Sequence, residues 1–173
     1  MRISPTTFVI ASALSLVGCD MAKANKIVGE TNTIVEAANN SFKKGEDAIK
    51  AAAEQHADAN AAAEAAGPCT DALADAATKY SQASKNLLEA AAIAGITKEF
   101  ADYLKAMGES HQKSAELMEL EKKPCKAFVD KSATAFEDYQ KAIEEIDKVR
   151  QDLNTIQAKA DKIRADNPDK FQK

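Results

Sequence analysis

Residues 21–66 read MAKANKIVGETNTIVEAANNSFKKGEDAIKAAAEQHADANAAAEAA, and their small and apolar side chains recur in alternating steps of three and four. The positions that follow this rhythm are Met21, Ala24, Val28, Thr31, Val35, Ala38, Phe42, Gly45, Ile49, Ala52, His56, Ala59, Ala63 and Ala66. A strict seven-residue repeat is typical of helices that pack along one seam and wind around each other. This stretch therefore predicts a long first helix over residues 20–66.

The same rhythm predicts three further helices, at about 69–94, 98–123 and 125–166, followed by a short tail over 167–173. Glycine favours the left-handed residue that ends a helix, and proline favours the first turn of the next one. Such residues separate the four segments, at Gly67-Pro68, Gly95-Ile96-Thr97, Pro124 and Asn167-Pro168. The low helix propensity of Asn39-Asn40-Ser41 marks a further point where the first helix could break.

These segments predict an all-α protein, in one of two arrangements. In the first, the chain reverses at both Gly67-Pro68 and Pro124, which gives an elongated antiparallel bundle of two long and two short helices on a two-helix coiled-coil stalk. In the second, both prolines are kinks in one long helical hairpin that reverses only near Gly95. The breadth of the apolar face at Val129, Phe136 and Ile143 favours the bundle, because a helix that is apolar on several sides needs several neighbours.

The amino-terminal stretch carries a targeting pattern. A cationic start, Met1-Arg2, precedes a short apolar run over residues 8–17, which is too short to span a bilayer and indicates an export signal. The run ends in Leu16-Val17-Gly18-Cys19, which resembles the lipobox of bacterial lipoproteins. That resemblance implies a cleaved signal peptide over residues 1–18 and a mature chain, 19–173, whose Cys19 carries a diacylglycerol and an N-acyl lipid.

The resemblance also implies a location in the bacterial cell envelope, with the membrane contacted through the lipid anchor. Asp20, directly after the lipidated cysteine, resembles the signal that retains enterobacterial lipoproteins in the inner membrane, facing the periplasm. The outer membrane is the alternative, because sorting rules differ among bacteria. The terminal Lys173 permits an analogy with the murein lipoprotein, whose last lysine is joined to peptidoglycan, and tethering there is a second alternative.

With Cys19 assigned to the lipid, Cys69 and Cys125 are the remaining cysteines. The compartment beyond the inner membrane is oxidising, so an exported pair predicts a disulfide. Both arrangements of the helices bring these two cysteines together. In the bundle they begin two helices at the same end, and in the hairpin they are nearly equidistant from the turn.

The sequence offers no familiar catalytic motif, such as a glycine-rich phosphate loop, a CxxC pair or HExxH, so we expect a protein that is not an enzyme and needs no cofactor besides its lipid. Loss of residues 1–18 removes Arg2, so 22 basic residues face 27 acidic ones and the net charge is −5. This balance argues against binding nucleic acid. The expected partner is another envelope protein.

His56 and His111 both fall on seam positions. If the chain reverses at both prolines, they would share one layer of the core and could ligate haem iron or a metal, which is an alternative function. A simpler interpretation is that each is a polar seam residue that sets the register and bonds a neighbour such as Tyr80 or Tyr139. The charged run Glu119-Leu120-Glu121-Lys122-Lys123 is interpreted as a solvated face.

Overall fold

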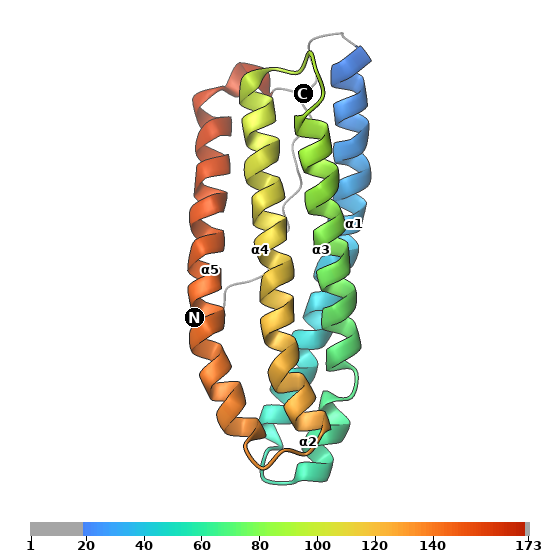
Figure 1. Ribbon diagram of the computed structural model, residues 1–173, viewed down its shortest axis with the longest axis vertical. Helices are drawn as coiled ribbons and strands as arrows, with labels where there is room; N and C mark the ends of the chain where they lie inside the picture. Colours follow the sequence, from blue (N-terminus) through green and yellow to red (C-terminus); the bar gives the residue numbers. More distant parts are fainter. Residues whose placement is uncertain (1–18, 172–173) are drawn as a thin grey trace.

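The computed structural model describes residues 19–171, and it confirms an all-α fold (Figure 1). Four long helices and one short helix make up this part of the chain, and no strand occurs within it. Their bounds are α1 Cys19–Glu54, α2 Ala59–Ala66, α3 Cys69–Ala91, α4 Lys98–Val129 and α5 Ala135–Asp166, followed by the 3-10 turn η1 Pro168–Lys170.

The long helices alternate in direction along the bundle. Figure 1 shows α1 running from the end that holds the α3–α4 connection toward the end that holds α2, with α3, α4 and α5 each reversing the direction of the one before. We call these the Cys19 end and the α2 end. Packing is sequential, because α1 contacts α3, α3 contacts α4 and α4 contacts α5. The chain therefore reverses three times, unlike the hairpin alternative.

The seam predicted for the first helix is the buried face of α1. Each of its positions between Met21 and Ala52 is buried. At Gly45 the α1 and α3 backbones approach closely, since a Cβ added there would lie 2.6 Å from Cγ of Leu73. Tyr80 Oη donates a hydrogen bond to Asn39 Oδ1 over 2.5 Å, and Ser41 Oγ donates to Asp75 Oδ2 over 2.5 Å. The helix stays unbroken at Asn39-Asn40-Ser41, where these side chains bond α3.

The first helix ends at Glu54, so the predicted extension to residue 66 is wrong. Residues 55–58 form a turn, and Asp58 then caps α2 by accepting hydrogen bonds from the backbone N–H groups of Asn60 and Ala61, over 2.9 and 3.2 Å. An aspartate in this position satisfies amides that the first turn of a helix leaves free. The alanine-rich stretch after it therefore forms a separate helix at the α2 end.

The helix boundary predicted at Pro124 is also wrong, since α4 continues through this buried proline to Val129. The reversal occurs at residues 130–134 instead. There Ser132 N–H donates to Ala127 O and Lys131 N–H donates to Phe128 O, with Lys131 at a φ of 54°. This pair of bonds is a Schellman motif. It has a lysine in the left-handed position that glycine usually occupies.

At the Cys19 end all four long helices share one core, so the predicted two-helix stalk is wrong for the described residues. That core contains Met21, Ala24, Val28, Leu87, Ala90, Phe100, Leu104, Met107 and Ala160. A stalk requires a first helix that extends well beyond the shorter helices packed on it, as a single helix over residues 20–66 would. Because residues 55–68 fold back instead, Cys69 starts α3 beside Gly45, with 3.3 Å between Cys69 Sγ and Gly45 O. From there α3 is long enough to reach the Cys19 end.

The α3–α4 connection lies at the Cys19 end and follows the predicted signals in part. Thr97 caps α4 as expected, its hydroxyl accepting the N–H of Phe100 over 3.3 Å. Gly95 has a φ of 86°, a conformation that glycine adopts without strain. The preceding helix ends at Ala91 rather than at residue 94, so the connection is a six-residue turn over 92–97.

Candidate functional site

Cys19, the predicted lipidation residue, is exposed and is the first residue of α1. Asp20 is also exposed and lies against the α3–α4 turn, since a Cβ added to Gly95 would sit 2.7 Å from Asp20 Oδ2. The side chain of Met21 is already part of the core, with 7% of its surface exposed. A single residue thus separates the thiol of Cys19 from the packed interior. The predicted cleavage segment, residues 1–18, and Lys173 lie outside the described residues.

Cys69 and Cys125 form a disulfide, as predicted, and both residues are buried. Their Cα atoms are 5.9 Å apart. The bond joins the first residue of α3 to α4 one residue after Pro124, and so fixes the two helices near the α2 end.

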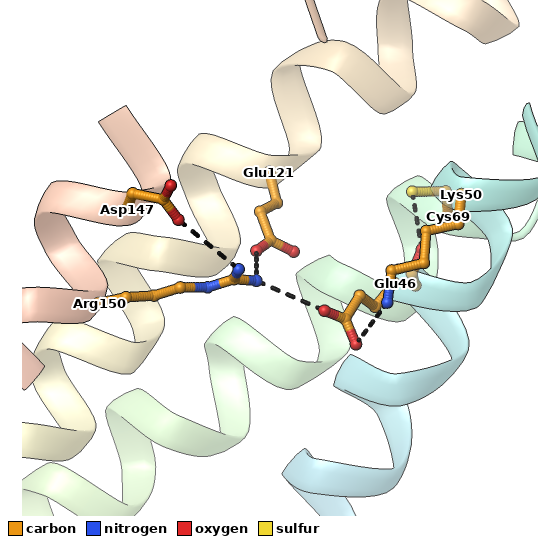
Figure 2. Close-up of polar contacts among 7 residues, drawn as sticks. Glu46, Lys50, Cys69, Glu121, Asp147 and Arg150 are labelled. Atoms are coloured by element: carbon orange, nitrogen blue, oxygen red, sulfur yellow. Dashed lines mark hydrogen bonds and ion pairs between the residues drawn. The ribbon is translucent and has the colours of Figure 1, made fainter. Parts of the chain in front are cut away.

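Next to the disulfide, three charged side chains from three helices meet, and we call Glu46, Glu121 and Arg150 the ion cluster (Figure 2). Arg150 of α5 places Nη2 3.3 Å from Glu121 Oε1 on α4 and 3.4 Å from Glu46 Oε1 on α1. Lys50 pairs with Glu46 over 3.3 Å, and Asp147 lies 4.0 Å from Arg150. The cluster links α5 with both α4 and α1.

Glu121 is the most deeply buried member of the ion cluster, with 4% of its side chain exposed against 21% for Glu46 and 30% for Arg150. Burial raises the pKa of Glu121 to about 7, and the attraction of Arg150 offsets this only in part. Its second oxygen, Oε2, has no hydrogen-bond partner among the described residues. Burial and the negative charge of Glu121 together raise the pKa of Tyr80 to about 12.

The run Glu119-Leu120-Glu121-Lys122-Lys123 was predicted to be a solvated face, and for Glu121 this is wrong. The signal that identifies it is the heptad rhythm, because Glu121 lies three residues after buried Met118 and four before buried Cys125. Its neighbour Lys122 does pair on the surface, with Glu119 over 2.9 Å. A charged residue at a seam position therefore points into the bundle, even where the residues on either side of it are charged and exposed.

The structure does not bring His56 and His111 together. His56 is exposed in the turn after α1 and stacks on Phe136 of α5, with ring centroids 4.0 Å apart. His111 is buried within α4 and stacks on Tyr80 at 5.9 Å. Because α1 ends before His56 and α4 extends beyond Pro124, the two histidines lie at different levels of the bundle.

Burial lowers the pKa of His111 to about 4, so its ring is neutral near pH 7. Its Nε2 atom has no hydrogen-bond partner within residues 19–171, and its contact with Tyr80 is between rings rather than through a hydrogen bond. Across the same residues, His, Cys, Asp and Glu side chains form no group of three that could hold a metal ion.

An open hollow of about 590 Å³ lies beside α4 in the half of the bundle that holds α2. Leu120 and Val149 provide apolar lining, and charge of both signs comes from Glu116, Glu119, Lys122, Lys123 and Lys126. Two large apolar side chains farther toward the α2 end, Val129 and Ile143, are each 39% exposed. This half of the molecule therefore presents a surface that mixes apolar side chains with charges of both signs.

Comparisons of the chain with protein-family models, with curated proteins and with solved structures find no match. Within residues 19–171, none of the helices is long and apolar enough to cross a bilayer.

Proposed function

We propose that this protein is a lipid-anchored lipoprotein of the bacterial cell envelope that acts without catalysis, as an interaction or structural module. The observation that carries the proposal is the position of Cys19. The cysteine of Leu16-Val17-Gly18-Cys19 is exposed at one end of a helical bundle, whereas Cys69 and Cys125 are bonded to each other in its interior. Of the three thiols, Cys19 is the one open to acylation.

The shape of the bundle supports a role as a spacer or docking body. The 36 residues of α1 extend about 54 Å at the helical rise, so the α2 end lies far from the anchor. Val129, Ile143 and the hollow beside Leu120 and Val149 all lie toward that distant end. A protein partner in the envelope would meet this part of the surface first. Asp20, exposed beside the anchor, supports retention in the inner membrane facing the periplasm.

A shared metal or haem site is disfavoured, since His56 and His111 each stack on a different aromatic ring in different parts of the fold. Tethering to peptidoglycan through Lys173 stays a prediction, since that residue lies outside the described part of the chain.

Metabolic labelling with an alkyne fatty acid in a bacterial host tests the anchor. The wild-type chain should incorporate label and fractionate with membranes, and Cys19→Ser should do neither. The matched control is a Cys69→Ser, Cys125→Ser double variant, which lacks the other two cysteines and should retain the label. Labelling of Cys19→Ser would overturn the proposal.

A second experiment addresses the partner. A photo-crosslinking amino acid at Ile143, in the α2-end half, should give a discrete protein adduct in intact cells. The same group at Gln151, an exposed position on α5 nearer the Cys19 end, is the matched control. Adducts of equal yield at both positions would contradict a partner surface near the α2 end.

A further inference from the structure

No flexible linker separates Cys19 from the packed core of the bundle. Helix α1 starts at Cys19, and Met21 and Ala24 are packed in the core that all four long helices share. A lipid on Cys19 would therefore hold the bundle itself at the membrane surface, rather than a loose segment in front of it.

The segment beside Cys19 is the α3–α4 turn over 92–97, which contacts Asp20 through Gly95. Residues 90–97 read AAAIAGIT and carry no charge. Ala92, Ala94 and Gly95 are exposed, while Ile93 and Ile96 are partly buried against the core. The turn itself is thus uncharged and largely apolar, while exposed Asp20 lies against it and exposed Lys98 directly follows it.

The turns at the opposite end have a different composition. Residues 55–58 read QHAD, and residues 130–134 read DKSAT. In these turns Asp58 caps α2, and Lys131 donates a hydrogen bond to Asn60 Oδ1 over 2.7 Å. These two turns therefore carry charged residues, whereas the 92–97 turn beside Cys19 carries none.

We infer that the 92–97 turn rests in the interfacial layer of a lipid bilayer, beside the lipid on Cys19, with the α2 end pointing away from the membrane. The inference rests on the proposed lipidation of Cys19. Small and apolar side chains enter that layer with little desolvation cost, and those near an acyl anchor add apolar burial to it. The bundle would then stand on the membrane in one orientation, which sets the height of its distal surface.

The sequence contains no tryptophan, so one introduced tryptophan reports on its own surroundings. We would place it at Ala94, an exposed position in the turn, in lipidated full-chain protein reconstituted into phosphatidylcholine vesicles that contain brominated lipid. Ile143→Trp, near the α2 end, is the matched control, and Ala92→Trp is a second turn position if Ala94→Trp folds poorly. Mass spectrometry of each sample verifies the lipid.

The turn tryptophan should be quenched by brominated lipid several times more strongly than the tryptophan at position 143, and its emission should shift to the blue. Equal quenching at both positions in verified lipidated protein would overturn the inference and leave the anchor intact. Absence of the lipid mass would overturn the anchor and this inference together. A blue shift that rises with protein concentration and occurs without vesicles would show that the turn contacts a second copy of the protein. That result would also overturn the inference.

Discussion

Arg150 on α5 lies 3.3 Å from Glu121, the carboxylate of α4 that is buried beside the disulfide. The same guanidinium nitrogen also lies within ion-pair distance of Glu46, so two carboxylates share one positive charge. Lys50 faces Glu46, and burial together with the charge of Glu121 raises the pKa of both Tyr80 and Tyr139. The ionised form of Glu121 is therefore poorly compensated, and stability should depend on its protonation.

Substituting Glu121→Gln should make the protein more stable above pH 7. The pKa of Glu121 is raised from 4.5 to about 7 on folding. Its contribution to the free energy of unfolding is therefore fully present below pH 4.5 and is lost as pH rises to 7. The loss in the wild type is up to about 3 kcal/mol at pH 8, since a tenfold change in proton affinity corresponds to about 1.4 kcal/mol. Urea unfolding followed by circular dichroism at several pH values measures it. A Glu121→Gln profile identical to that of the wild type would contradict the assignment.

Substituting His111→Phe should change the pH dependence in the opposite sense. The pKa of His111 is lowered from 6.5 to about 4 on folding, so its contribution is present above pH 6.5 and is lost as pH falls toward 4. In the wild type the two slopes oppose each other between pH 4.5 and 6.5. The stability of His111→Phe should therefore fall as pH rises through this window, whereas that of Glu121→Gln should rise. If stability changed with pH in the same direction in both variants, Glu121 and His111 would not be the groups that control the pH dependence of stability.

Removing the disulfide with Cys69→Ala and Cys125→Ala should lower the free energy of unfolding by about 4 kcal/mol. The bond closes a loop with a sequence separation of 56, and loop closure of that length accounts for the estimate. A reducing agent should destabilise the wild type by a similar amount and leave the double variant unchanged. Cys19→Ala is the control, because Cys19 is exposed and takes no part in this bond. A double variant as stable as the wild type would argue against the bond.

Two glycines in α1 should respond oppositely to alanine. At Gly45 a Cβ would meet Leu73 side-chain atoms at 2.6 Å, so Gly45→Ala should destabilise the fold by about 1–3 kcal/mol. At Gly29 nothing lies within 4 Å, so Gly29→Ala should stabilise α1 by roughly 0.5–1 kcal/mol. Thermal unfolding of both variants checks this pair. The same sign of change in both would contradict the close α1–α3 approach.

The heptad rhythm predicted the buried face of α1 through Ala52 and the central positions of α3 and α4, because burial in a bundle follows the helical period. The same rhythm could not locate the ends of helices. Past Glu54 the pattern of small residues continues into α2 although the backbone turns, and only the capping role of Asp58 marks the break. Alanine fits either side of such a turn, so composition alone did not separate the two helices.

The position of the reversal between α4 and α5 escaped prediction for a related reason. Pro124 is the conspicuous residue in that region, yet it lies inside α4, and the turn is made by Lys131 in a left-handed conformation. A lysine there gives no sequence signal, unlike the glycine expected in a Schellman motif. The disulfide was nevertheless predicted correctly, because both arrangements of the helices brought Cys69 and Cys125 together.

The most direct test of the proposed lipid anchor is the mass of the mature amino-terminal peptide, released by protease from protein purified out of bacterial membranes. We predict that the chain begins at Cys19 and that this residue carries the added mass of a diacylglycerol and one further acyl chain. A peptide that begins elsewhere, or a Cys19 with an unmodified thiol, would contradict the anchor.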